Sequence, residues 1–266
     1  MDDETAVSTR ERTHHRRWSI VFGVAGIALL PWIVLIYLGQ PPTAAVGNLA
    51  LAAGGALTAI AVGLVVCAVL TLLDSAYLVM TASATAALAL CAGFFHVVTG
   101  TATDPRAAAF MTVLVLGPAA VLCGGVARRE VTPGRRRTSD RVLAVLFMVA
   151  AVATILAWAR TASAGFPAQN AHHLKLTWIV LDVAEAAALI TAAVALRLRP
   201  LLVPVAASVT GALLFCDVWF NVVGAVGDAR TSGIQMAFVS IPLGIAAFVV
   251  GAGEVRRDPE ASRPAR

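Results

Sequence analysis

Residues 174–226 read LKLTWIVLDVAEAAALITAAVALRLRPLLVPVAASVTGALLFCDVWFNVVGAV. Two apolar runs, Leu174–Leu196 and Leu201–Val226, flank the short connection Arg197-Leu198-Arg199-Pro200. Each run has the ~20 apolar residues that a helix needs to cross the hydrocarbon core of a bilayer. Proline cannot continue a helix and commonly follows its end, as Pro200 does here. This stretch therefore predicts two antiparallel transmembrane helices joined by a tight turn.

The rest of the chain is as apolar as this stretch. Of its 266 residues, 59% are hydrophobic and 13% are charged, and the mean hydropathy is +0.84. A soluble globular protein has about 25% charged residues. The composition excludes a soluble enzyme and an ordinary nucleic-acid-binding domain. It predicts an all-α polytopic membrane protein whose main partner is the lipid bilayer, with no nucleic-acid partner.

The same length criterion predicts eight transmembrane helices. Basic residues precede the first apolar run, as in a signal peptide, but this run is longer than the usual ~7–15-residue hydrophobic region. We therefore expect an uncleaved first span; cleavage near residues 41–45 would leave seven. The eight predicted spans are Trp18–Leu38, Ala45–Leu72, Ala76–Val98, Ala108–Ala127, Val142–Ala159, Leu174–Leu196, Leu201–Val226 and Ile234–Gly253.

The distribution of basic residues orients these spans. Sixteen of the 20 Lys and Arg residues fall on one side, and the other side receives only Arg106, Arg160, Lys175 and Arg230. Because basic residues accumulate in cytoplasmic loops, both termini are predicted to be cytoplasmic, in a plasma-membrane protein. The net charge of +5 is interpreted in the same way, rather than as a sign of an anionic ligand.

Two segments indicate an internal repeat. Thr85–Val98 (TAALALCAGFFHVV) and Thr210–Val223 (TGALLFCDVWFNVV) align without a gap and share seven of fourteen residues. Four helices per copy is an even number, so both copies cross the membrane in the same sense, related by an axis along the membrane normal. Coincidence between low-complexity helices is the alternative. The predicted organisation is a basic tail (1–17), a first four-helix repeat (18–127), a basic linker (128–141), a second four-helix repeat (142–253) and a tail (254–266).

Three carboxylates fall within the predicted spans: Asp182, Glu185 and Asp217. An acid at a helix centre costs roughly 2.5–3.5 kcal/mol on insertion scales, so each is a candidate functional residue. Asp182 lies ~12 Å and Asp217 ~14 Å from the outer ends of neighbouring antiparallel helices, at 1.5 Å per residue.

Helical spacing places Trp178 on the same face of its helix as Asp182 and Glu185. It also places Asn221 on the same face of the next helix as Asp217. We expect one acidic pocket with aromatic walls in the outer half of the membrane. In the first copy, Ala92 takes the place of Asp217 and His96 that of Asn221, which favours a single site and makes His96 a secondary candidate. The predicted pocket residues are Trp178, Asp182, Glu185, Asp217, Trp219 and Asn221.

Several functions fit such a site. Clustered acids in an apolar environment bind protons or a cation, which favours binding or transport of a small solute with proton or cation participation. A protonated acid acting as general acid on a lipid or isoprenoid, as in a membrane terpene cyclase, is the enzymatic alternative. A third alternative is an accessory subunit of a membrane complex or a homo-oligomer, in which the acids bond with Asn221, Thr191 or Thr210 and hold helices together.

Other chemistry is not indicated by the sequence. No phosphate-binding loop, hydrolase elbow or zinc-protease motif occurs, and no cofactor is predicted. Adjacent histidines, as in His14-His15 and His172-His173, do not share a helical face, so no metal site is predicted. None of the four cysteines belongs to a CxxC motif, and each is expected to be small apolar packing material.

The segments Trp178-Ile-Val-Leu-Asp182-Val-Ala-Glu185-Ala and Cys216-Asp217-Val-Trp219-Phe220-Asn221-Val resemble a group of uncharacterised actinobacterial multi-pass membrane proteins. Those proteins carry a WxxxDxxEA helix followed by a DAWFD helix. The resemblance covers roughly Trp158 to Gly253 and implies fold and source rather than an activity. This chain departs from the pattern at Asn221, where the family has an acid, so one carboxylate of the family's presumed site is missing.

Overall fold

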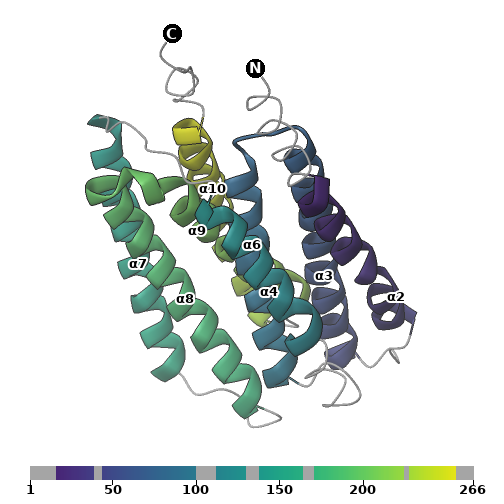
Figure 1. Cartoon of the computed structure of the whole chain (residues 1–266). Coiled ribbons are helices and arrows are strands. Elements are labelled where there is room, and N and C mark those ends of the chain that lie inside the picture. Colours follow the sequence, from purple (N-terminus) through teal and green to yellow (C-terminus); the bar gives the residue numbers. More distant parts are fainter. Residues whose placement is uncertain are drawn as a thin grey trace, which may run out of the picture.

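The computed structural model describes residues 16–38, 44–99, 112–129, 138–163, 171–224 and 228–255, which are helical except for short turns (Figure 1). The prediction of an all-α protein is confirmed for these residues. The first helix covers residues 16–28, and a turn at Leu29 leads into α2 (Leu30–Leu38). The remaining elements are α3 (Ala44–Leu72), α4 (Leu78–Thr99), the π-helix η1 (Thr112–Leu116), α6 (Gly117–Arg129), α7 (Thr138–Ser163), α8 (Ala171–Leu198), the 3-10 helix η2 (Pro200–Leu202), α9 (Val203–Trp219), the π-helix η3 (Phe220–Gly224) and α10 (Asp228–Val255).

Six helices in the described residues are long and apolar enough to cross a membrane, which identifies the chain as a membrane protein. Two further apolar helices, Thr112–Ala127 and Arg141–Leu156, are shorter over the part that can be described. Their positions correspond to the fourth and fifth predicted spans, so the count of eight stays a prediction. The six long spans are Arg16–Leu38, Leu51–Leu72, Leu78–His96, Trp178–Leu198, Val203–Gly224 and Arg230–Val255.

Both tight connections expected from the sequence are present. Between α3 and α4, the Ser75 N–H donates to the Leu70 carbonyl oxygen over 3.0 Å. Asp74 in this turn has a φ of 49°, a left-handed conformation in which Asp is among the better-tolerated residues. Between α8 and α9, only Arg199 and the 3-10 turn η2 separate the helices. Short connections of this kind force each helix pair to lie antiparallel and adjacent.

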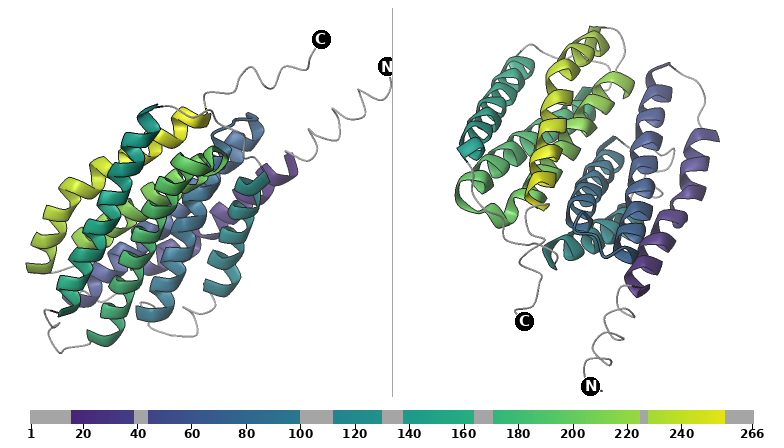
Figure 2. Two further views of the ribbon diagram at one scale, coloured as in Figure 1. Left: turned by 90° about the vertical axis from the view of Figure 1, so that its left-hand side faces the viewer. Right: turned by 90° about the horizontal axis from the view of Figure 1, so that it is seen from above.

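The helices form one bundle with two sides, as the view from above shows (Figure 2). The first helix, α2, α3, α4 and α6 make up one side, and α7, α8, α9 and α10 the other. Helices α4 and α9 pack against each other and join the two sides. Most residues in the apolar part of the span that contains α9 are buried, whereas few are in the span that contains α10. Helix α9 is therefore central, and residues on it are the best placed to form an enclosed site.

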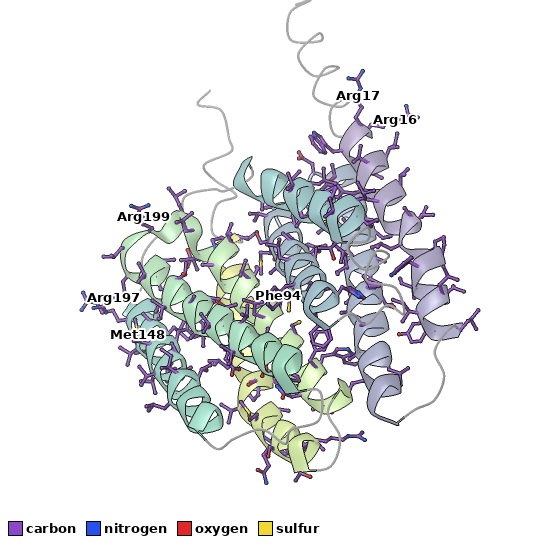
Figure 3. The ribbon with its side chains drawn as sticks, turned by 90° about the horizontal axis from the view of Figure 1, so that it is seen from below. Arg16, Arg17, Phe94, Met148, Arg197 and Arg199 are labelled. Carbon is purple, nitrogen blue, oxygen red and sulfur yellow. The ribbon has the colours of Figure 1, made fainter. Side chains whose placement is uncertain are left out.

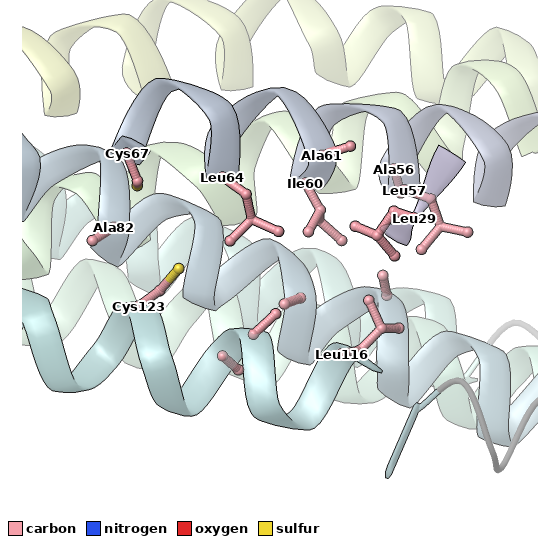
Figure 4. Packing of buried hydrophobic residues seen from close by; sticks show 14 of the residues in the cluster. Leu29, Ala56, Leu57, Ile60, Ala61, Leu64, Cys67, Ala82, Leu116 and Cys123 are labelled. Carbon is pink, nitrogen blue, oxygen red and sulfur yellow. The ribbon is translucent and has the colours of Figure 1, made fainter. Parts of the chain in front are cut away.

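Small residues let the central helices approach closely. The larger apolar core lies between α3, α4 and α6, where Ala56, Ala61 and Ala82 alternate with Leu57 and Leu64 (Figure 4). In membranes, where lipid tails are as apolar as Leu, van der Waals contact across small residues drives helix association. The core thus combines small residues that let helices approach with larger apolar side chains that fill the space between them.

Helices α9 and α10 show the same principle with two reciprocal contacts. Phe248 of α10 lies over Gly211 of α9, and Phe215 of α9 lies over Gly244 of α10. The two rings stack with their centroids 6.0 Å apart. Each glycine therefore provides the space that the opposite phenylalanine fills, and α10 is fixed along the outside of α9.

Basic side chains gather at one end of the bundle. Figure 3 shows Arg16 and Arg17 at the start of the first helix and Arg197 and Arg199 at the connection between α8 and α9. These two places and the carboxyl end of α10 lie at the same end of the bundle in Figure 1. Arg230 begins the span that starts at the opposite end. Arg16, Arg17, Arg197 and Arg199 therefore lie at the end of the bundle that the predicted orientation places in the cytoplasm.

Candidate functional site

The three intramembrane carboxylates meet in one cluster. Asp182 and Glu185 come from α8, and Asp217 comes from the antiparallel neighbour α9. One carboxylate oxygen from each of the three lies within 4.8 Å of the others. The i, i+3 spacing on α8 and the tight connection between α8 and α9 bring them together, as expected from the similar predicted depths of Asp182 and Asp217.

The carboxylates of this cluster are largely buried, so repulsion between their negative charges is strong. Glu185 is 4% exposed and Asp217 is 1% exposed, while Asp182 is partly buried. Within the described part of the chain, none of the three forms an ion pair. Negative charges this close repel one another strongly where water is excluded. Bound protons or a bound cation are the means of neutralising such a cluster.

The hydrogen bonds that would make the cluster purely structural are mostly missing. Thr191 Oγ1 donates to the Ala187 carbonyl oxygen over 2.7 Å, and Thr210 Oγ1 donates to the Ala206 carbonyl oxygen over 2.8 Å. Both hydroxyls are therefore engaged with their own helices. Among the described residues, Asp182 and Glu185 accept no hydrogen bond. Of the three partners considered from the sequence, only Asn221 bonds with an acid.

Asn221 is tied to Asp217 from the following turn. Its Nδ2 donates to Asp217 Oδ1 over 2.7 Å and to the Asp217 backbone carbonyl oxygen over 3.0 Å. Asn221 lies in the π-helix η3, which directly follows α9. On α10, a Cβ added to Gly233 would lie 2.6 Å from the Asn221 carbonyl oxygen. Gly233 therefore allows α10 to lie directly against the backbone of Asn221.

The two tryptophans of the expected pocket have different surroundings. Trp219 faces α3: its Nε1–H donates to the Ala52 carbonyl oxygen over 2.9 Å. The indole also lies on Gly55, where an added Cβ would overlap it. Trp219 thus links α9 to α3. Trp178 is partly buried against Leu181 and Leu213, in the apolar contact between α8 and α9.

Helices α4 and α9 meet through side chains that occupy matching positions in the two aligned segments. The Sγ atoms of Cys91 and Cys216 are 3.0 Å apart, and both are free thiols. The rings of Phe95 and Phe220 stack with centroids 4.1 Å apart. His96, the secondary candidate, is buried beside Phe95 and is not part of the carboxylate cluster.

Sequence reasoning missed the contacts that support the site from neighbouring helices. Ala52, Gly55 and Gly233 gave no chemical signal, because alanine and glycine are common throughout the apolar helices. The pairing of Cys91 with Cys216 was indicated only by their alignment. The side chains of His172, His173 and Lys175 and the structure of the segments at 39–43, 100–111, 130–137, 164–170 and 225–227 lie outside the described residues.

Comparison of the chain with protein-family models, with curated proteins and with solved structures gives no significant match. The assignment of a function therefore depends on the chemistry and geometry of the carboxylate cluster.

Proposed function

We propose that this membrane protein binds or transports a small solute, and that the cluster of Asp182, Glu185 and Asp217 takes part by binding protons or a cation. The observation that carries the proposal is the combination of close approach and missing partners. Three acids lie within 4.8 Å of one another, and only Asp217 receives a side-chain hydrogen bond from the described residues.

The missing partners distinguish this proposal from a structural role. A structural polar network in a membrane gives each acid a donor from a neighbouring helix, because an unsatisfied buried group costs free energy. Among the described residues, Asp182 and Glu185 receive no such donor, which supports a role for the cluster in binding rather than in holding helices together. Such an arrangement is typical of residues that bind or move ions.

The architecture proposed around this site has eight transmembrane helices in two parallel repeats. Helix α4 runs from residue 78 to 99, and α9 with η3 runs from 203 to 224, so both bounds are displaced by 125 residues. The same displacement separates Cys91 from Cys216. Side chains beside a two-fold axis meet their own symmetry equivalents, as Cys91 with Cys216 and Phe95 with Phe220 do.

The proposed orientation follows from the basic end of the bundle. With Arg16, Arg17, Arg197 and Arg199 at the cytoplasmic face of the plasma membrane, both termini are cytoplasmic. Asp182 then lies 11 residues from Ala171 at the outer end of α8, or ~17 Å at 1.5 Å per residue. The site would be reached from outside the cell.

The experiment that tests the proposal measures ion movement directly. Purified protein is reconstituted into liposomes that contain a pH-sensitive dye, and gradients of Na⁺, K⁺, Mg²⁺ or Ca²⁺ are imposed in turn. The proposal predicts that at least one gradient moves protons through the wild-type protein. Asp217→Asn should abolish this flux, while Asp74→Asn, a matched change in the turn between α3 and α4, should leave it unchanged.

Flux that is indistinguishable between wild type, Asp217→Asn and empty liposomes would contradict proton-coupled transport with these ions. Acid-dependent conversion of a lipid in extracts would then favour the enzymatic alternative. Co-purification of a second membrane protein, with tolerance of Asp217→Asn, would favour the accessory-subunit alternative.

A further inference from the structure

All four cysteines of the chain lie next to another cysteine. Cys91 of α4 and Cys216 of α9 have their sulfur atoms 3.0 Å apart, close enough for one thiol to donate to the other. Cys123 of α6 lies beside Cys67 of α3, and both are in the core shown in Figure 4. The sequence predicts that each cysteine is small apolar packing material. Cysteines with that role alone do not need to lie in pairs.

We propose that Cys91 and Cys216 form a redox site, which a small membrane-permeant hydroperoxide oxidises to an intramolecular disulfide between α4 and α9. The distance between the two sulfur atoms is already close to that in a disulfide. A disulfide has its sulfur atoms ~2.05 Å apart, so the two thiols need to approach by about 1 Å. Since α4 and α9 already pack against each other, side-chain rotation and a small helix movement supply this approach.

Exposure distinguishes this pair from the other one. Cys91 is partly exposed and Cys216 is 4% exposed, whereas Cys67 and Cys123 are both 0% exposed. An oxidant therefore reaches Cys91 first. Cys91 packs against the apolar contact of Leu181 and Leu213, which favours a neutral oxidant such as hydrogen peroxide.

The proposed reaction has two steps. The Cys91 sulfur attacks one peroxide oxygen, the O–O bond breaks, and a sulfenic acid and one water are formed. The Cys216 sulfur then attacks the Cys91 sulfur, the S–O bond breaks, and the hydroxide leaves as a second water with the Cys216 proton. The two sulfurs together lose two electrons, and the peroxide gains them.

The product would join the two sides of the bundle by a covalent bond. Cys216 directly precedes Asp217 in α9, so the bond would fix the helix that carries one acid of the cluster. The formation of the bond itself does not depend on the proposed function. Its test has a covalent readout that is separate from any measurement of ion movement.

The experiment uses the full-length protein, reduced, purified in detergent and exposed to hydrogen peroxide. The sample is then denatured with N-ethylmaleimide present, reduced, and treated with deuterated N-ethylmaleimide, so that cysteines from disulfides carry the heavy label. We expect the heavy label on Cys91 and Cys216 in equal amounts, with Cys67 and Cys123 carrying the light label. The intact protein should lose two hydrogen atoms before the reduction step.

Two conservative variants separate the steps. In Cys216→Ser, the oxidation of Cys91 should stop at the sulfenic acid, which dimedone captures; in Cys91→Ser, Cys216 should stay reduced. Equal oxidation of all four cysteines, no oxidation, or the same dimedone capture at Cys91 in wild type and Cys216→Ser would overturn the proposal. If a variant fails to fold, the distribution of the heavy label in the wild type decides alone.

Discussion

Asn221 donates a hydrogen bond from Nδ2 to Asp217 Oδ1 over 2.7 Å, within the same helix and one turn away. This bond gives Asp217 a donor that Asp182 and Glu185 lack among the described residues. The amide also occupies one of the oxygens of Asp217, so the second oxygen is the one left for a proton or a cation. Asn221 therefore orients the acid rather than adding a charge to the cluster.

Changing Asn221 to Asp should make the stability of the protein depend on pH. A protonated carboxyl group at this position donates to Asp217 as the amide does, whereas an ionised one adds a fourth negative charge and removes the donor. We expect Asn221→Asp to match the wild type at acidic pH and to lose thermal stability as the pH rises. The measurement is the unfolding temperature in detergent between about pH 5 and pH 8, where side chains of this type change charge when perturbed.

Asn221→Leu is the control for this pH series, because it removes the donor without adding a charge. Its stability relative to the wild type should be the same throughout the series. An Asn221→Asp profile parallel to that of Asn221→Leu would show that residue 221 does not interact with the acids electrostatically.

Gly233→Ala should disturb the site without changing a polar group. The added Cβ would lie 2.6 Å from the Asn221 carbonyl oxygen and 2.8 Å from the Asn221 Cβ, so η3 or α10 must move. Overpacking of this kind costs about 1–3 kcal/mol. We expect a lower unfolding temperature and weaker cation or proton binding. Gly124→Ala is the matched control, since nothing lies within 4 Å of its added Cβ.

Gly55→Ala should loosen the link between α3 and α9. The new methyl group overlaps the indole of Trp219, whose Nε1–H donates to the Ala52 carbonyl oxygen over 2.9 Å. Trp219→Phe removes that donor, at a cost of about 0.5–1.5 kcal/mol, and also removes the ring atoms that the methyl group meets. The double variant should therefore be less destabilised than the sum of the two single changes. Strict additivity would mean that the indole does not occupy the space at Gly55.

The stacked rings of Phe95 and Phe220 test the contact between matching positions of the two segments. With centroids 4.1 Å apart, they should show a favourable coupling of about 0.5–1.5 kcal/mol in a double-mutant cycle with leucine. Phe215 and Phe248, with centroids 6.0 Å apart between α9 and α10, give a second cycle for comparison. No coupling between Phe95 and Phe220 would remove one support for the two-repeat architecture.

Much of the fold follows from the sequence because membrane helices obey a simple length rule. The apolar run Leu174–Leu196 predicts α8 to within a few residues, and Leu201–Val226 predicts α9 with η3. Backbone hydrogen bonds must be satisfied within each helix in lipid, so few other structures are available. The number of transmembrane helices is harder to establish, because Thr112–Ala127 and Arg141–Leu156 are short in the described residues.

The candidate site could be predicted in part, for a similar reason. Helical spacing and a tight turn fix which acids on α8 and α9 are neighbours, so the approach of Asp182, Glu185 and Asp217 follows from local rules. Contacts between helices that are distant in sequence do not follow from local rules. The direction of Trp219 towards Ala52 depends on how α3 packs on α9, and the sequence carries no pattern that sets this packing. The sequence predicts Trp219 in the pocket wall, and the structure adds that its indole contacts α3.

The most direct test of the carboxylate cluster is the thermal stability of the purified protein across a series of pH values and of added Na⁺, K⁺, Mg²⁺ and Ca²⁺. A ligand that binds the folded state stabilises it by RT ln(1 + [L]/Kd), or about 2.7 kcal/mol at a hundred times Kd. We expect protons or one of these cations to raise the unfolding temperature of the wild type. Asp182→Asn, Glu185→Gln and Asp217→Asn should each reduce this response and be at least as stable without ligand, with Asp74→Asn as control. A wild-type response that all three variants retain, together with a marked loss of stability in each, would show that the acids hold helices together and form no binding site.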